Sequence, residues 1–143
     1  MKKERILAAF MLAISLLAGS CIKNNTCDNT MCTMEFKTIS IMVNDITMPP
    51  VSRQLTKFYT KNKTNDTLIN TSDGTTSFEW NYYRQYGYPV VSDGQIPKPT
   101  DSLAVEFFGE INDVVVVRET FVVGHDCCHI FKLRGKDSVV LAP

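Results

Sequence analysis

The most reactive side chains in this sequence belong to its cysteines and histidines, and four of these residues gather near the C-terminus. His125, Cys127 and His129 occupy alternate positions, and alternate side chains of a β-strand project from one face. Imidazole nitrogen and thiolate sulfur bind zinc or copper, and Cys27 or Cys32 could complete a tetrahedral set. One hypothesis is therefore a metal-binding or redox site in this His-Asp-Cys-Cys-His segment. His129 could equally be a packed, hydrogen-bonded histidine.

The alternative chemistry for the same cysteines is disulfide formation. A bond between the neighbours Cys127 and Cys128 would need a strained eight-membered ring, so we expect each to pair with Cys27 or Cys32. Two connectivities remain open, and each bond closes a loop of roughly 100 residues that could contribute up to about 4 kcal/mol. Disulfides are the default in an oxidising compartment, so we favour them and predict no metal or other cofactor.

The N-terminus indicates such a compartment. Residues 1–5 carry a net positive charge, and residues 6–18 are almost all apolar but too few to span a bilayer. The following Leu-Ala-Gly-Ser-Cys, ending at Cys21, resembles the lipobox of bacterial lipoproteins. The resemblance implies a signal peptide over residues 1–20 and a diacylglycerol on Cys21. Removing Cys21 from the five cysteines leaves an even four for disulfides.

The charge of the mature chain restricts its partners. Of 15 basic and 15 acidic residues, the leader contains three and one, which leaves 12 and 14. A chain with this balance has no basic footprint for nucleic acid. It also has no electrostatic attraction to anionic lipid, so its membrane attachment must come from the lipid on Cys21. We predict a protein of the cell envelope, anchored to the outer membrane of a Gram-negative bacterium, with the periplasmic or outer face left open.

The remaining chain favours a single all-β domain. Residues 21–32 are rich in Asn and Thr and predict a tether, while residues 33–143 repeatedly alternate apolar and polar side chains. About seven strands at this spacing predict an antiparallel β-sandwich, with a small β-barrel as the alternative. A strand is expected over the alternating aromatics at 78–82. The last hairpin is expected to join Cys127–Leu133 to Ser138–Leu141.

One longer segment carries a resemblance. Residues 114–141, which include Asp-Cys-Cys-His before the last expected strands, resemble the C-terminal end of small uncharacterised lipoproteins of Bacteroidetes type. The resemblance implies an immunoglobulin-like or prealbumin-like sandwich, and it implies no activity.

Aromatic residues crowd the middle of the chain and offer a contact surface, because their faces stack on sugars or anchor protein interfaces. We expect Phe78, Trp80 and Tyr82 to share one face of a strand and enter the core. Tyr83, Tyr86 and Tyr88 fall off that face or in the following loop, and we predict them as the binding residues.

No catalytic constellation is recognisable. The two histidines lie beside the cysteine pair, and the sequence has no Gly-rich phosphate loop or nucleophile elbow. We therefore predict a non-enzymatic binding or structural module with a protein or glycan partner.

Overall fold

The computed structural model describes Cys27, residues 30–46 and residues 54–141. The expected signal peptide, Cys21 and most of the tether lie outside the described residues. Within the described part of the chain, no helix has the length and apolar character needed to cross a membrane.

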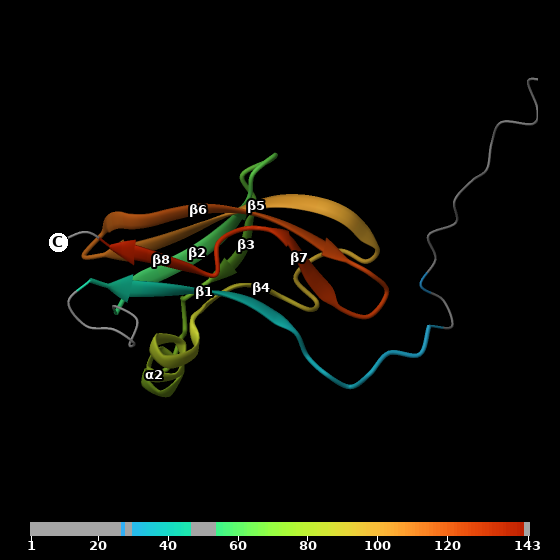
Figure 1. The fold of residues 1–143 in the computed structure, drawn as a ribbon, viewed down its shortest axis with the longest axis horizontal. Helices are drawn as coiled ribbons and strands as arrows, with labels where there is room; N and C mark the ends of the chain where they lie inside the picture. The colour runs from blue at the N-terminus through green and yellow to red at the C-terminus, as the bar shows by residue number, and fades with distance from the viewer. Residues whose placement is uncertain (1–26, 28–29, 47–53, 142–143) are drawn as a thin grey trace, which may run out of the picture.

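Within these described residues, eight strands form two open sheets that pack face to face (Figure 1). The strands are β1 (Thr38–Asp45), β2 (Lys57–Asn62), β3 (Leu68–Thr71), β4 (Tyr88–Ser92), β5 (Thr100–Ile111), β6 (Val114–His125), β7 (Ile130–Arg134) and β8 (Ser138–Leu141). One sheet has the order β4-β1-β8 and the other β3-β2-β5-β6-β7. The predicted β-sandwich is confirmed. Strand β4 falls in the stretch after the aromatics that was expected to be a loop.

The core lies between the two sheets and comes from alternate residues of each strand. Ile41 and Val43 of β1 face Phe58 of β2 and Phe107 of β5 across it, and each is at most 1% exposed. Burying one such side chain contributes about 1.5–3 kcal/mol. The alternation seen in the sequence therefore marks the faces that hold the sandwich together.

The longest strands, β5 and β6, form a hairpin through a two-residue turn. Ile111 pairs with Val114, and the intervening Asn112 and Asp113 have φ angles of 50° and 64°. Two consecutive left-handed residues suit the right-handed twist of a hairpin, and Asn and Asp tolerate this conformation best after glycine.

The predicted last hairpin is wrong. Strand β7 pairs antiparallel with β6, whereas β8 pairs parallel with β1 in the other sheet. The chain changes sheets at Gly135, whose φ is +130° and whose added Cβ would lie 2.2 Å from Cδ1 of Phe121. The turn-like residues after β7 do not reverse the chain, because Ile130 lies beside His125 and Lys136 lies beside Glu119, further back along β6. They move the chain to the other sheet without changing its direction.

Candidate functional site

The expected strand over the aromatics at 78–82 is also wrong, because these residues form helix α2 (Ser77–Tyr86). The Thr76 hydroxyl accepts a hydrogen bond from the Glu79 N–H at 3.3 Å, and the Glu79 carboxylate accepts one from the Thr76 N–H at 2.8 Å. This reciprocal pair is a capping box, which starts a helix by satisfying free N–H groups. Hydrogen bonds from Thr76 also lower the Glu79 pKa. Gly87, with φ 101°, ends the helix.

One side of α2 completes the core. Trp80 and Tyr83 are three residues apart and lie on the same helix face. Each packs edge-on against Phe58, with ring centroids 5.6 Å apart. Burial raises the pKa of the Tyr83 hydroxyl, and Glu79 nearby adds to the effect. Tyr83, which was predicted as a binding residue, therefore packs mainly against the core.

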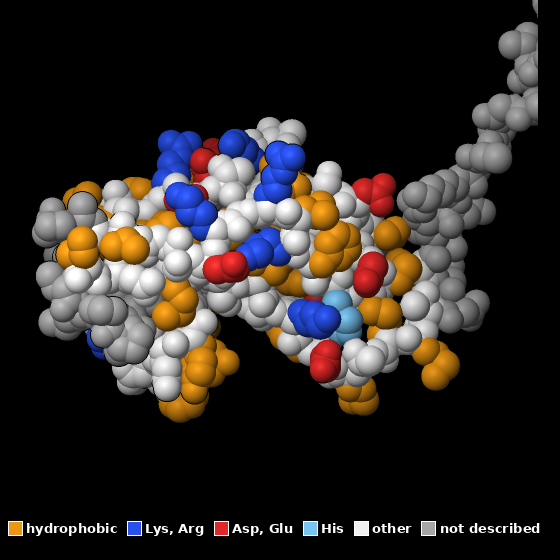
Figure 2. Space-filling view, viewed as in Figure 1, with side chains coloured by type: hydrophobic (Ala, Val, Ile, Leu, Met, Phe, Trp, Pro, Cys, Tyr) orange, Lys and Arg blue, Asp and Glu red, His pale blue; other side chains and the backbone are white. Residues whose placement is uncertain are grey.

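The opposite side of α2 is uncovered. Phe78, Tyr82 and Tyr86 follow at intervals of four residues and are 78%, 52% and 58% exposed. The rings of Tyr82 and Tyr86 lie 4.6 Å apart, tilted by 39°. Figure 2 shows hydrophobic side chains gathered on the projecting helix at the lower edge of the molecule. Tyr86 is exposed as predicted, whereas Phe78 and Tyr82, expected in the core, are exposed because the period is helical.

Tyr88, which was predicted as a third exposed tyrosine, is buried. It begins β4, is 0% exposed, and its hydroxyl accepts a hydrogen bond from the Leu55 N–H at 3.1 Å. Burial raises the pKa of this hydroxyl. The prediction of Tyr88 as a binding residue is therefore wrong, because the assumed loop is a buried strand.

A hollow of about 360 Å³ opens between α2 and strands β1 and β4. Its lining residues carry aromatic or uncharged polar side chains, apart from one glycine and one proline: Phe36, Thr38, Ser40, Asn70, Tyr82, Tyr83, Tyr86, Gly87, Pro89 and Ser92. We call it the aromatic hollow.

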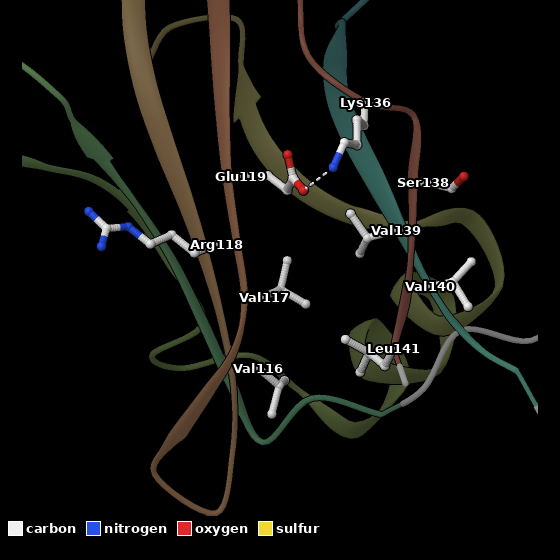
Figure 3. A pocket seen from close by; sticks show the side chains of 9 residues that line it. All are labelled: Val116, Val117, Arg118, Glu119, Lys136, Ser138, Val139, Val140 and Leu141. Atoms are coloured by element: carbon white, nitrogen blue, oxygen red, sulfur yellow. Dashed lines mark hydrogen bonds and ion pairs between the residues drawn. The ribbon is translucent and has the colours of Figure 1, made fainter. Parts of the chain in front are cut away.

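Two other hollows of the described chain differ in charge. The hollow between β6 and β8 is about 350 Å³ and includes Arg118, Glu119 and Lys136. Figure 3 shows Val117 and Val139 pointing into it, beside an ion pair between Lys136 Nζ and Glu119 Oε1 at 2.6 Å. A hollow on the outer face of the five-stranded sheet has two lysines, an aspartate and a glutamate in its lining. Of these three, the aromatic hollow alone has no charged side chain.

The polar groups of the aromatic hollow are of two kinds. Asn70 holds its walls together, because its Nδ2 donates to the Pro89 carbonyl at 3.0 Å and its Oδ1 accepts from Gln95 at 3.2 Å. By contrast, the hydroxyls of Thr38 and Ser40, on one face of β1, have no side-chain hydrogen bond to any described residue. These two hydroxyls are available to a ligand.

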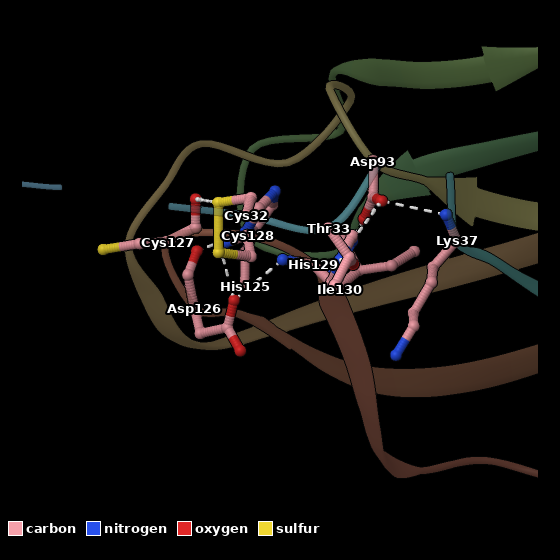
Figure 4. Close-up of polar contacts among 10 residues, drawn as sticks. All are labelled: Cys32, Thr33, Lys37, Asp93, His125, Asp126, Cys127, Cys128, His129 and Ile130. Carbon is pink, nitrogen blue, oxygen red and sulfur yellow. Dashed lines mark hydrogen bonds and ion pairs between the residues drawn. A yellow bond between two sulfur atoms is a disulfide. The ribbon is translucent and has the colours of Figure 1, made fainter. Parts of the chain in front are cut away.

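The four cysteines lie at the far end of the sandwich. Cys127 and Cys128 are in the loop between β6 and β7, and they bond to Cys27 and Cys32 respectively. The predicted disulfides are confirmed, and the structure selects one of the two connectivities. The cysteines occupy the turn of a hairpin and not the start of a strand, as the sequence had suggested. Figure 4 shows Cys32 bonded to Cys128 over this loop.

A histidine and a carboxylate join this loop to the tether. His129 Nδ1 lies 2.9 Å from Asp93 Oδ2, and its Nε2 lies 2.8 Å from Thr33 Oγ1. Asp93 also accepts hydrogen bonds from the N–H groups of Lys37 and Ile130, each at 2.8 Å. Burial opposes ionisation of Asp93, but hydrogen bonds from His129, Lys37 and Ile130 outweigh it and lower its pKa to about 2.

The hypothetical metal ligands are not arranged as a coordination set. Cys127 Sγ is in a disulfide, and His129 has both ring nitrogens in hydrogen bonds. His125 is buried, with Nδ1 against the carbonyl of Asp126. In the part of the chain that the structure describes, no three His, Cys, Asp or Glu residues are placed to hold a metal ion.

Thr33, His129 and Asp93 also match the hydroxyl–imidazole–carboxylate order of hydrolases. The nearby N–H groups of Cys128 and His129 could act as oxyanion donors, but Asp126 Oδ1 already accepts both, at 2.6 and 2.7 Å. The arrangement is therefore suited to holding the tether. Sequence reasoning missed Thr33 and Asp93, because they are 60 positions apart and no local motif links them.

No protein-family model, curated protein sequence or solved structure matches this chain.

Proposed function

We propose that this protein is a lipid-anchored, non-enzymatic binding module of the bacterial cell envelope, and that the aromatic hollow is its contact surface. The observation that carries the proposal is the exposure of Tyr82 and Tyr86 over a hollow without charged side chains. Water-exposed aromatic groups are costly to a folded domain, and clusters of them mark binding surfaces.

The proposed anchor and the disulfides act together. The Cys27–Cys127 bond ties Cys27 to the loop between β6 and β7. Only six residue steps separate Cys27 from Cys21, and six residues span at most about 20 Å. A lipid on Cys21 would thus hold this end of the domain close to the bilayer. Helix α2 projects from the sandwich away from that loop, which leaves the aromatic hollow accessible (Figure 1).

The anchor is tested by replacing the modified cysteine. We expect Cys21→Ala to move the protein from the membrane fraction to the soluble fraction. We also expect the wild-type protein extracted from membranes to have an intact mass that includes diacylglycerol. A wild-type protein without lipid would contradict this part of the proposal.

The contact surface is tested with the full protein in lipid nanodiscs, exposed to envelope material from the bacterium that makes it. We expect the wild type to retain this material and the Tyr82→Ala/Tyr86→Ala variant to lose retention. Phe78→Ala is the matched control, because Phe78 is exposed on the same helix face but does not line the hollow. Equal retention by all three proteins would exclude the aromatic hollow.

A further inference from the structure

The lining of the aromatic hollow limits the charge of its ligand. A charged ligand normally meets an opposite charge in its site, because burial of an unpaired charge is costly. The ten residues that line this hollow include no Asp, Glu, Lys, Arg or His. Its ligand should therefore be uncharged, unlike any ligand that suits the hollow of Figure 3.

The aromatic rings specify a flat apolar face on that ligand. Tyr82 and Tyr86 line one side of the hollow with their ring centroids 4.6 Å apart, and Phe36, which is 71% exposed, comes from the strand side. The face of an aromatic ring carries partial negative charge and attracts C–H groups that carry partial positive charge. A pyranose ring has such a face of C–H bonds.

The polar side chains specify hydroxyl groups around that face. The hydroxyls of Thr38 and Ser40 can each donate and accept a hydrogen bond, and so can the phenols at the ends of Tyr82 and Tyr86. Sugar hydroxyls have the same dual capacity. A volume of about 360 Å³ is at the small end of the range for ligand sites, so one or two sugar rings would fill it.

An extended peptide fits the same surface less well. Peptides usually bind a sheet edge by adding a strand, which requires free N–H and C=O groups on that edge. The hollow lies against β4, where Pro89 has no N–H and its carbonyl already accepts a hydrogen bond from Asn70. Main-chain pairing is therefore blocked at this point of the edge.

We propose that the aromatic hollow binds an uncharged carbohydrate by stacking a pyranose ring on Tyr82 and Tyr86 while Thr38 and Ser40 bind its hydroxyls. This inference rests on the proposed function and names the ligand class of the same surface.

The test is saturation-transfer NMR with the full protein in lipid nanodiscs prepared without sugar-based detergents. The neutral probes are the methyl pyranosides of glucose, galactose and mannose, and the matched acidic probes are glucuronate and galacturonate. We expect transfer to the ring C–H protons of at least one neutral probe and weaker transfer to the acidic ones. The signal should fall by roughly fivefold or more in Tyr82→Ala/Tyr86→Ala, the loss of about 1 kcal/mol of stacking, and persist in Phe78→Ala.

Transfer to no neutral probe, preference for the acidic probes, or equal signals in the double variant would each overturn the carbohydrate proposal. Protease digestion of the envelope material separates this outcome from failure of the proposed function. If retention depends on Tyr82 and Tyr86 but disappears after digestion, the hollow binds a protein: the carbohydrate proposal fails and the proposed function stands. If retention never depends on these tyrosines, both fail. Circular dichroism and urea unfolding of the double variant confirm that it is folded.

Discussion

Tyr86 and Tyr88 are two residues apart but belong to different parts of the molecule, so their replacement should have opposite consequences. Tyr86 is 58% exposed and Tyr88 is 0% exposed. We predict that Tyr88→Phe lowers the free energy of unfolding and leaves envelope binding unchanged. Tyr86→Ala should leave the free energy of unfolding nearly unchanged and weaken binding.

The magnitudes follow from the contacts of each side chain. Tyr88→Phe removes the acceptor of the Leu55 N–H, and a buried donor without a partner costs about 1–3 kcal/mol. Tyr88→Ala would add a cavity and cost roughly 3–5 kcal/mol. Tyr86→Ala removes an exposed ring and its contact with Tyr82, while alanine is the better helix former, so we expect a change within about 1 kcal/mol.

Urea unfolding of the oxidised proteins, followed by circular dichroism, gives both free energies of unfolding. The same proteins in nanodiscs give the retention of envelope material. A Tyr88→Phe protein as stable as the wild type would refute the hydrogen bond from the Leu55 N–H, and a Tyr88→Ala protein as stable as the wild type would refute the assignment of Tyr88 to the core. A Tyr86→Ala protein that is strongly destabilised, or that binds normally, would refute the separation of the helix into a core side and a contact side.

Three further predictions concern the frame around the hollow. The pKa of Asp93 is about 2, below its usual 3.8, so the ionised carboxylate stabilises the fold above pH 4 and this stabilisation is lost as the pH falls toward 2. Asp93→Asn should lower the free energy of unfolding by about 2 kcal/mol at pH 6, and the free energy measured by urea unfolding should then change less between pH 4 and 2. Replacing Cys32 and Cys128 together by Ser should cost roughly 2 kcal/mol, because the second disulfide still closes nearly the same long loop; reducing both bonds should cost more than twice as much. Gly135→Ala should destabilise by about 2 kcal/mol or more in thermal unfolding, whereas Gly94→Ala, also at positive φ but with nothing within 4 Å, should cost about 1 kcal/mol.

The sequence predicted the sandwich because the alternation of apolar and polar residues along a strand indicates which face of that strand is buried. It also restricted each C-terminal cysteine to a partner in the tether, because the chain offers no other cysteines once Cys21 is set aside. Which of the two connectivities forms depends on how the tether approaches the loop between β6 and β7, and no residue pattern encodes that approach.

The helix was missed because three aromatics at 78, 80 and 82 fit a period of two over too short a window. The signal that could have found it lies at the helix ends, where Thr76 and Glu79 form a capping box and Gly87 follows the last turn. A helical period places Trp80 and Tyr83 on one side and Tyr82 and Tyr86 on the other. This period explains why Tyr82 and Tyr86 are both exposed on the side that we propose as the contact surface.

Strand β8 shows that local sequence signals can predict a strand without predicting its partner. Its sequence predicted a strand correctly, but its partner is β1, almost one hundred residues earlier in the chain. Such pairing depends on how the two sheets pack, and a hairpin with the preceding strand was the simplest expectation from local signals.

Photocrosslinking in living cells tests directly whether the aromatic hollow contacts a partner, with a benzophenone amino acid in place of Tyr86 or, as the control, Val114. Val114 is 62% exposed and begins β6, next to the turn from β5, outside the aromatic hollow. We predict envelope adducts from position 86 and few or none from position 114. Adducts from position 114 alone, or equally from both positions, would contradict the assignment of the aromatic hollow as the contact surface.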